Sequence, residues 1–373
     1  MKILVVQDYL RSGGTERQSV LLANAFAAAG HATTLLTFRP GGPLDPTVAP
    51  GVNRRSLQHR DLHLDWFAPG LFRAIERDPP DVVLCMGRMA NCWAHAIRNA
   101  LADRWPRSAV ICTMRTGKRL PWLFRHSLRL ARHIVANSRD ARDHLVARHT
   151  IPPEKISVIY NSLVFPAASA IAGGIRPRND PLRTAQGATA ATKVLLSVAM
   201  FRPEKNQREL IEIAAGLPEQ LDWQLWLAGE GPARAACEQL VAEKKLRARM
   251  KFLGFHRDPS ALYAAADLAV HASSSESLSN FLIEAQAHGL LAVAYEAQGI
   301  AECFIPGRTG WAIPRGDQTA FRATLSRRIS EPASAHAERA ADARAFARST
   351  FDPARQVAAY LDLFQKLTST TAP

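Results

Sequence analysis

Residues 273–289 read SSSESLSNFLIEAQAHG, a polar loop that passes into a short apolar segment and ends at a glycine. Residue types favoured at helix N-caps precede the apolar segment, namely Ser277, Ser279 and Asn280. The pattern predicts a helix that begins close to residue 280 and stops at Gly289. Glu276 then lies in the loop before the helix, and Glu284 lies one turn inside it.

The two carboxylates and the helix start between them suit one extended ligand. If the spacing were helical throughout, they would lie about 12 Å apart, close to the length from ribose to hexose in a nucleotide sugar. The first amides of a helix have no partner within it and form a ready phosphate site. We therefore expect Glu284 to bind ribose hydroxyls, Glu276 to bind the sugar, and three backbone amides to hold the diphosphate: those of Leu278, Ser279 and Asn280. The alternative is that Glu276 only faces the helix dipole and that Glu284 is solvated.

Apolar segments alternate with amphipathic ones on both sides of this stretch. The predicted strands of the second half are KVLLSVAM, WQLWLAGEG, MKFLGF, LAVHAS and LLAVAY. Those of the first half are KILVV, ATTLLTF, DVVLCM, AVICTM, HIVANS and KISVIYN. Apolar strands separated by helices indicate parallel sheets that are covered on both faces. The sequence therefore predicts two doubly wound, Rossmann-like α/β domains, which we expect to face an interdomain cleft at the carboxyl ends of their strands.

The chain length supports two domains, because single cores stop growing before 373 residues. We place the first domain at residues 1–165 and the second at 191–350. Residues 166–190 are rich in Ala, Gly, Pro and Arg and have no apolar period, which is typical of a loop and linker. Residues 351–373 hold a terminal helix that has no sheet left to cover, and we expect it to cross back to the first domain.

Several segments, in this order and spacing, resemble the family-4 retaining glycosyltransferases of the GT-B fold. The signature of that family is a glutamate, seven residues and a second glutamate, which stands here as ESLSNFLIE. The resemblance continues through KVLLSVAMFRPEKNQREL, WLAGEGP, FLGFHRDPSALYAAADLAVHASS and QGIAECFIPGRTGW, and in the first half through RSGGTERQSVLLANAFAAAGH and HIVANSRDARDHL. It covers nearly the whole chain. It implies transfer of a sugar from a nucleoside-diphosphate sugar, without a metal or other cofactor.

Two cations follow the first strand of the second half in FRPEKNQ, Arg202 and Lys205. Cations at this place can neutralise a diphosphate and stabilise its departure, so we predict that both bind the sugar donor and form the catalytic set together with Glu276. The alternative is a solvated basic turn. In the resembled family an arginine commonly stands two residues nearer the strand, where this chain has Met200, and we expect Arg202 to substitute for it.

Gly13 and Gly14 stand between the first strand and the first helix, where missing side chains let backbone amides approach a phosphate. The resemblance implies that this loop contacts the diphosphate of the sugar donor, whereas a glycine pair is otherwise an ordinary turn. The segment is not GxGxxG, and no acidic residue ends the next strand as a ribose reader. A dinucleotide oxidoreductase is therefore disfavoured.

Many members of the resembled family carry a histidine after the strand that corresponds to AVICTM, and this chain has Arg115 there. We interpret Arg115 as an acceptor-side residue that binds an anionic acceptor or the diphosphate, with a surface arginine as the equal alternative. Retaining transfer in this family is often thought to use the donor phosphate as the base, which asks little of a protein base. Three histidines remain candidates, although packing roles are commoner for such positions: His95, His126 and His133.

Most of the net charge of +14 lies in the first half, where residues 1–165 hold 23 Lys and Arg against 12 Asp and Glu. Residues 115–133 contain six Lys and Arg and no acid, interleaved with apolar and aromatic residues. Such a segment suits a helix on an anionic membrane surface, or a packed helix with a basic outer face. Nucleic acid is a less favoured hypothesis for the partner, because the aromatic and basic residues cluster in one predicted helix and not on an exposed sheet.

No apolar stretch approaches the roughly 18 residues of a membrane-spanning helix, and the N-terminal apolar run is too short for a secretory signal. We therefore expect a cytosolic protein, with peripheral attachment to the cytosolic membrane face as an option. The five cysteines lack paired spacings, and the two histidines of HRDLH lack a further ligand nearby. The sequence predicts neither disulfides nor a metal site.

The residues favour a retaining glycosyltransferase that moves a sugar from a nucleotide sugar to a glycan or lipid-linked acceptor, in cell-envelope polysaccharide or lipopolysaccharide biosynthesis. A nucleotide-sugar epimerase keeps the fold but needs an acid and base set that we do not identify. A sugar phosphorylase is usually a much larger chain with pyridoxal phosphate. Two alternatives are not enzymes, a basic binding protein and a catalytically silent relative that scaffolds a complex.

Overall fold

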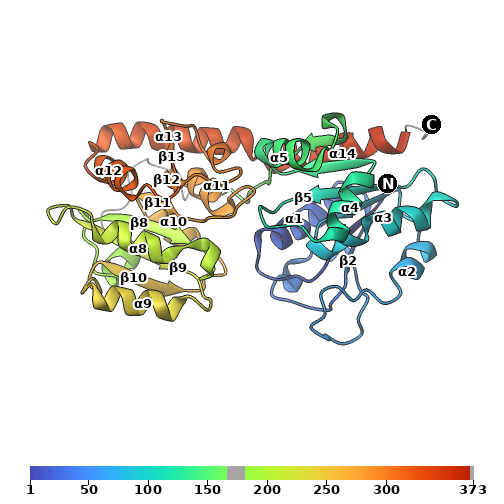
Figure 1. The fold of residues 1–373 in the computed structure, drawn as a ribbon, viewed down its shortest axis with the longest axis horizontal. Helices are drawn as coiled ribbons and strands as arrows, with labels where there is room; N and C mark the ends of the chain where they lie inside the picture. Colours follow the sequence, from blue (N-terminus) through green and yellow to red (C-terminus); the bar gives the residue numbers. More distant parts are fainter. Residues whose placement is uncertain (166–180, 370–373) are drawn as a thin grey trace. The chain divides into compact units, whose positions relative to one another are not determined.

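The computed structural model describes residues 1–165 and 181–369, which form two compact units (Figure 1). The first unit is Met1–Ser162 together with Pro353–Pro373, and the second is Leu163–Asp352. Each unit is built on one sheet in which every strand pair is parallel. The predicted fold class, two doubly wound α/β domains, is confirmed.

The sheet of the first unit has the strand order β3-β2-β1-β4-β5-β6-β7. Its strands are β1 (Lys2–Gln7), β2 (Ala32–Thr37), β3 (Asn53–Ser56), β4 (Val82–Cys85), β5 (Ala109–Met114), β6 (His133–Ala136) and β7 (Ile156–Val158). The connecting helices are α1 (Gly14–Ala28), α2 (Leu71–Arg77), α3 (Arg88–Ala102), α4 (Trp122–Leu130) and α5 (Arg139–His149), with short turns η1 (Asp45–Thr47) and η2 (Pro153–Lys155). Every residue of β4 and β5 is buried, as expected for inner strands covered on both faces.

The edge strand β3 reads NRRS, and all of its residues are exposed. It exists because its backbone pairs with β2, not because it buries side chains. A segment without apolar residues carries no strand signal, so the sequence did not predict it. Its two arginines suit an exposed edge, since charged side chains discourage pairing with other chains.

The sheet of the second unit has the strand order β10-β9-β8-β11-β12-β13. Its strands are β8 (Lys193–Val198), β9 (Trp223–Ala228), β10 (Met250–Gly254), β11 (Leu268–His271), β12 (Leu291–Tyr295) and β13 (Gly310–Ile313). Its helices are α7 (Pro181–Ala185), α8 (Gln207–Ala215), α9 (Arg234–Glu243), α10 (Ser260–Ala265), α11 (Asn280–Ala287), α12 (Gln318–Ile329) and α13 (Ala333–Thr350), with turns η3 (Pro203–Lys205) and η4 (Ala301–Cys303). Because β8 pairs with β11, the loops that follow these two strands leave the sheet as neighbours.

The predicted linker differs from the structure at its end. Residues 166–180 lie outside the described ranges, but Pro181–Ala185 form α7, where a loop was expected. The Arg183 side chain is buried and donates to the carbonyls of Ala265 and Thr192 and to the Asp267 carboxylate. This segment is therefore fixed to the second unit by one charged side chain, which a search for apolar periodicity does not detect.

The terminal helix α14 (Pro353–Ser369) belongs to the first unit (Figure 1). The rings of Tyr360 and Phe364 pack edge-on against Phe26 of α1, with centroids 6.0 and 5.5 Å away. Gln356 donates to the carbonyl of Tyr160 and to the Gln18 side chain. Within the described ranges, no helix combines the length and apolar character that crossing a bilayer requires.

Candidate active site

The turn after β8 places Lys205 next to the loop after β11. Pro203–Lys205 form η3, and Asn206 takes a left-handed conformation with φ of 53° before α8 begins. The carbonyl of Glu204 accepts hydrogen bonds from the Ser273 hydroxyl at 3.0 Å and from the Ser274 amide at 2.8 Å. The serines that open the polar loop therefore hold the two segments together.

Lys205 and His271 both contact the same carboxylate oxygen. Lys205 Nζ lies 2.5 Å from Glu276 Oε1, and His271 Nε2 lies 2.9 Å from the same atom. The side chain of Glu276 is 11% exposed and that of Lys205 is 25% exposed. The structure thus brings together two of the three residues predicted to be catalytic, and neither lies in open solvent.

The neighbours of Glu276 keep its carboxyl group ionised. Burial alone would raise its pKa, but the hydrogen bond from His271 and the charge of Lys205 outweigh burial and lower the pKa to about 2. An ionised carboxylate only accepts hydrogen bonds, so Nε2 of His271 carries the proton in this contact. Glu276 is therefore a ready acceptor for hydroxyl groups at physiological pH.

Helix α11 begins at Asn280, as predicted, and Ser279 is its N-cap. The Ser279 hydroxyl accepts a hydrogen bond from the Leu282 amide at 3.4 Å. The segment before the helix is held by a close backbone approach, because a Cβ on Gly299 would overlap the carbonyl oxygen of Ser277. Gly299 also has a left-handed φ of 72°, a second reason why this position favours glycine. Leu278 and Ser279 are buried in this tight segment, with the helix start directly after them.

Glu284 lies in α11 and is half-buried, not a solvated helix residue. Tyr263 of α10 donates a hydrogen bond from its hydroxyl to Glu284 Oε2 at 2.6 Å. The ring of Tyr263 stacks between Phe281 and His288, with centroids 6.1 and 5.0 Å away. The second glutamate of the predicted pair is thus fixed by a buried tyrosine.

Arg202 is the N-cap residue of η3 and is half-buried. Met200, which stands where the resembled family commonly has an arginine, is exposed. Within the described residues, neither side chain makes a polar contact, whereas Lys205 contacts Glu276. The structure therefore places Arg202 in the correct turn without joining it to Glu276, and its contact with a diphosphate stays a prediction.

The loop after β9 packs tightly on the loop after β8. A Cβ on Gly229 would overlap the carbonyl of Ala199, and one on Gly231 would overlap the carbonyl of Phe201. Both glycines have positive φ, 141° and 152°. Only glycine fits these two positions, so the AGEG segment fixes the course of the turn that carries Arg202 and Lys205.

In the first unit, Gly13 is the N-cap of α1 and Gly14 is its first residue. The carboxylate of Glu16 folds back onto Gly13, and a Cβ on Gly13 would overlap it. An acid near a helix N-terminus stabilises the helix dipole. A side chain at position 13 would displace only the flexible end of Glu16, so this contact does not require glycine, and contact of the loop with a diphosphate stays a prediction.

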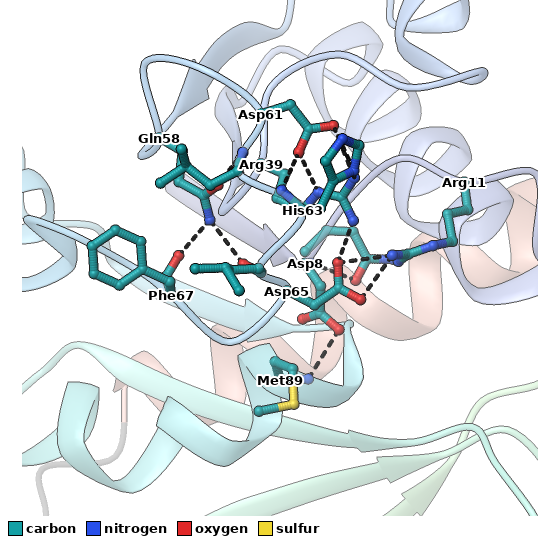
Figure 2. A network of polar contacts seen from close by, with 12 residues as sticks. Asp8, Arg11, Arg39, Gln58, Asp61, His63, Asp65, Phe67 and Met89 are labelled. Atoms are coloured by element: carbon teal, nitrogen blue, oxygen red, sulfur yellow. Dashed lines mark hydrogen bonds and ion pairs between the residues drawn. The ribbon is translucent and has the colours of Figure 1, made fainter.

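A network of ion pairs occupies the ends of β1 and β2 in the first unit (Figure 2). The buried guanidinium of Arg39 lies 2.7 Å from Asp61 Oδ1 and 2.7 Å from Asp65 Oδ1. Arg11 donates to both oxygens of Asp65 at 2.7 Å. Gln58 donates to the carbonyls of Leu64 and Phe67, each at 2.8 Å. The loop of residues 58–67 is therefore fixed at several points.

Asp8 lies beneath this network, directly after β1 (Figure 2). Its oxygens accept hydrogen bonds from the amides of Met89 at 2.9 Å and Ala90 at 2.7 Å, in the first turn of α3. Burial, together with the nearby carboxylates of Glu16 and Asp65, raises the pKa of Asp8 to about 7 in spite of these bonds. No local pattern in the sequence singles out this residue.

Arg115 anchors the terminal helix. It donates to the Asn161 side chain at 2.5 Å and to the Tyr360 hydroxyl at 2.6 Å. Its Nε is buried and has no hydrogen-bond partner among the described residues. Arg115 is therefore not an ordinary surface arginine, and its binding of an acceptor or a diphosphate stays a prediction.

The three candidate histidines do not gather at the carboxyl edge of the first sheet. His133 begins β6, at the amino end of the strand, and contacts Ser157 at 2.8 Å. His95 lies in the middle of α3 and packs edge-on against His126 of α4 at 5.2 Å. The contact of His133 with Ser157 and the packing of His95 on His126 agree with the packing roles expected to be commoner for these positions, and an acceptor-side role for any of the three stays a prediction.

Sequence reasoning missed two residues that hold the predicted carboxylates, His271 and Tyr263. His271 is the last residue of β11, where its register places it at the carboxyl end of the sheet. That position, in the strand directly before the polar loop, is a signal that could have found it. Tyr263 lies 21 residues from Glu284, and no local pattern links the two.

Two family models match the chain. The model described as Glycosyltransferase Family 4 matches residues 12–163, and the model described as Glycosyl transferases group 1 matches residues 179–348. Lipopolysaccharide core biosynthesis glycosyltransferase LpsE of Rhizobium meliloti (strain 1021) is 25% identical over 329 residues, which are 86% of this chain and 87% of that protein. N-acetyl-alpha-D-glucosaminyl L-malate synthase of Bacillus anthracis is 30% identical over 138 residues, 37% of this chain and 36% of that protein.

The fold has known counterparts. The structure of Anabaena Alr3699/HepE in complex with UDP-glucose has a TM-score of 0.79 with this chain and is 21% identical, covering 98% of this chain and 100% of that one. A glycosyltransferase from Rickettsia africae ESF-5 has a TM-score of 0.82 at 18% identity, covering 99% of both chains. With both halves matched by family models and the whole chain matched in fold, this protein belongs to glycosyltransferase family 4 and has the GT-B fold.

Proposed function

We propose that this chain is a retaining glycosyltransferase that moves a sugar from a nucleoside-diphosphate sugar to a glycan or lipid-linked acceptor, in cell-envelope polysaccharide or lipopolysaccharide biosynthesis. The observation that carries the proposal is the contact of Lys205 with Glu276 at the carboxyl end of the second sheet, beside the start of α11. An anionic ligand that also has hydroxyl groups can use both members of this pair. A nucleotide sugar has both features.

In the proposed complex, Lys205 leaves Glu276 and contacts the diphosphate. Its charge neutralises the negative charge that develops as the diphosphate departs, which stabilises the transition state. Glu276 is then available for hydroxyl groups of the sugar, and Glu284 for those of the ribose. The amides of Leu278, Ser279 and Asn280 and the guanidinium of Arg202 complete the diphosphate site.

The relatives support the substrate classes. HepE was solved with UDP-glucose, so UDP-sugars are the first donors to test. LpsE is named for lipopolysaccharide core biosynthesis, which supports a saccharide or lipid-linked acceptor. We assign the acceptor to the first unit, where the excess of basic residues lies and where Arg115 directly follows β5.

We propose retention of the anomeric configuration because the chain resembles a family of retaining enzymes, in which the donor phosphate is often thought to serve as the base. In place of a histidine the chain has Arg115, which donates to Tyr360 and Asn161, and a guanidinium offers only donors. The leaving phosphate can then take the proton of the acceptor hydroxyl on the same face. Since Lys205 supplies positive charge to that phosphate, we expect catalysis that persists in the presence of a metal chelator.

We further propose that residues 115–133 contact an anionic membrane surface. In α4, Phe124 and Leu128 are buried against the sheet, whereas Trp122 and Leu123 are 65% and 50% exposed. Exposed aromatic and aliphatic side chains among arginines suit the interface of an anionic bilayer. Both alternatives for this segment thus find support, with one face packed and one face open.

Binding to vesicles tests the membrane proposal. The protein should sediment with phosphatidylglycerol vesicles and much less with phosphatidylcholine vesicles, and replacing Trp122 and Leu123 with serine should reduce sedimentation severalfold. The matched control replaces Leu62 and Leu64, two exposed leucines in another loop of the same unit. Equal sedimentation of the wild type and the Trp122 and Leu123 variant would contradict the proposal.

A panel of nucleotide sugars tests the sugar-donor proposal. Ligands that bind only the folded state raise the melting temperature by mass action. We expect one or two nucleoside-diphosphate sugars to stabilise the protein and the corresponding free sugars to have no effect. If no nucleoside diphosphate or nucleotide sugar shifts melting at millimolar concentration, the proposal is wrong.

The stereochemistry of the product tests retention. Proton NMR during turnover reports the anomeric configuration of the first product before it equilibrates. We expect the configuration of the sugar donor. An inverted product would contradict retention, and a free nucleotide sugar with an altered ring carbon would indicate an epimerase instead.

A further inference from the structure

Two aromatic side chains hold the two glutamates of the candidate site, and one ring lies against both. His271 contacts Glu276 at 2.9 Å, and Tyr263 contacts Glu284 at 2.6 Å. The ring of Phe281, in the first turn of α11, lies 5.7 Å from the ring of His271 and 6.1 Å from that of Tyr263. His271 lies on β11 and Tyr263 lies on α10, and both of their rings pack against Phe281.

We propose that His271 and Tyr263 are positioning residues with separate tasks, His271 holding Glu276 for the sugar and Tyr263 holding Glu284 for the nucleoside. This inference rests on the proposed function, because it assigns the two ends of a nucleotide sugar to the two glutamates. His271 is 3% exposed and Tyr263 is buried, so each acts through its carboxylate and not by touching the ligand.

The task of His271 follows from the sharing of one oxygen. Glu276 Oε1 accepts from both Lys205 and His271. Lys205 is more exposed and sits on a turn, whereas His271 is fixed in a strand and packed against Phe281. When Lys205 moves to a diphosphate, His271 is the donor that remains on Glu276. Without it, the carboxylate loses its orientation at the stage when the sugar reacts.

The task of Tyr263 follows from its place at the other glutamate. The ring of Tyr263 stacks on Phe281 and on His288. This packing holds the ring so that its hydroxyl donates to Glu284. The short hydrogen bond from Tyr263 helps to hold the carboxylate in one orientation, which lowers the entropic cost of ribose binding. Its loss therefore weakens binding of the nucleotide, whether or not a sugar is attached.

A matched pair of variants separates the two tasks. Tyr263→Phe removes only the hydroxyl, whereas His271→Phe keeps an aromatic ring but exchanges the imidazole for a somewhat larger phenyl group. We expect His271→Phe to lower kcat roughly tenfold, as loss of one hydrogen bond to a charged group does, with the Kd of the nucleoside diphosphate within twofold of wild type. We expect Tyr263→Phe to raise that Kd roughly fivefold or more and to leave kcat within twofold.

Two further variants test whether the changes in kcat and Kd come only from altered folding. His271→Gln keeps an N–H donor of similar reach, and it should recover most of kcat. Tyr295→Phe removes a tyrosine hydroxyl that contacts Glu209 at 2.7 Å elsewhere in the same unit, and it should change neither kcat nor Kd. Equal melting curves for the Phe variants and Tyr295→Phe exclude global loss of folding as the cause.

The outcomes distinguish this inference from the proposed function. Calorimetric titration with UDP, ADP and GDP comes first. If none of them binds the wild type, the sugar-donor site itself is wrong. If one binds but His271→Phe keeps full kcat, if Tyr263→Phe keeps full affinity, or if both variants change kcat and Kd alike, the division of tasks is overturned.

Discussion

Each unit buries one carboxylate where its central strands end, Asp8 in the first and Glu276 in the second, and the two have opposite neighbours. Asp8 accepts from two backbone amides and lies near the acids Glu16 and Asp65. Glu276 accepts from His271 and Lys205. Burial disfavours ionisation in both places, but the pKa is about 7 for Asp8 and about 2 for Glu276.

The cations near the two carboxylates differ in the same way. In the first unit, Arg39 and Arg11 are tied to Asp61 and Asp65 by several bonds (Figure 2). In the second unit, Lys205 contacts one acid among the residues that the structure describes, Glu276. A cation with one partner is easily transferred to a ligand, whereas one held by two carboxylates is part of the framework. The comparison supports our proposal that the second unit binds the anion and that the network of the first unit is structural.

The largest effect should come from removing the transferable cation. Lys205→Ala should lower kcat about 100-fold or more, because stabilisation of the leaving diphosphate is lost. The same substitution should raise the pKa of Glu276, in the direction of the raised pKa of Asp8, because Glu276 then lacks its neighbouring cation. Steady-state kinetics measures the first effect. Lys244→Ala, which removes an exposed lysine of the same unit, is the control and should keep wild-type turnover.

The pH dependence of stability should differ in sign between the two carboxylates. The folded pKa of Glu276 lies below its ordinary value of 4.5, so its contribution is present above pH 4.5 and lost as pH falls toward 2. We expect the wild type to lose up to about 3 kcal/mol relative to Glu276→Gln over that range. Urea unfolding at several pH values measures it, and a constant difference would contradict the charge of Glu276.

For Asp8 the folded pKa of about 7 lies above the ordinary value of 3.8. Its contribution is therefore present below pH 3.8 and lost as pH rises through 7. The wild type should lose stability relative to Asp8→Asn between pH 4 and pH 7, by up to about 4 kcal/mol. The same unfolding series measures this change. A wild type that instead gains stability relative to Asp8→Asn as pH rises would contradict the raised pKa of Asp8.

Removing the framework cation should affect folding and not ligand binding. Arg39→Met leaves Asp61 and Asp65 without their shared partner, and we expect a fall of about 5 °C in the melting temperature. The affinity for a nucleoside diphosphate should stay within twofold of wild type. Loss of nucleotide affinity in this variant would contradict a purely structural task for the network of the first unit.

The smallest effect belongs to the contact of Arg115 with the terminal helix. Tyr360→Phe removes one hydroxyl that accepts from the guanidinium, and we expect a loss of about 1 kcal/mol in the free energy of unfolding. Chemical unfolding followed by circular dichroism measures it. If turnover falls tenfold while stability does not change, Arg115 acts on substrate and not on α14.

The sequence predicted the regular parts of this molecule because they obey local rules. Apolar strands such as β5 and the capped start of α11 are visible in a window of a few residues. The edge strand β3 and the helix α7 were missed, because backbone pairing forms the first and the side chain of Arg183 holds the second. Neither cause leaves an apolar period.

The residues of the candidate site divide in the same way, into those that a local motif reveals and those that only the fold brings together. Lys205, Glu276 and Glu284 could be selected from the motif, but their supports could not. His271 and Tyr263 are recognised only when the fold places them against the carboxylates. The network of Arg39 joins residues more than 20 positions apart, and its acids lie in a loop without regular structure. Long-range polar contacts of this kind require coordinates.

The most direct test of the account is calorimetric titration of one nucleoside diphosphate, and of its monophosphate, into the wild type, Lys205→Ala and Arg39→Met. We predict that Lys205→Ala loses at least about tenfold in affinity for the diphosphate and much less for the monophosphate, as removal of one charge-assisted contact requires. Arg39→Met should bind like the wild type. Unchanged diphosphate binding by Lys205→Ala would contradict the assignment of the anion site to the second unit.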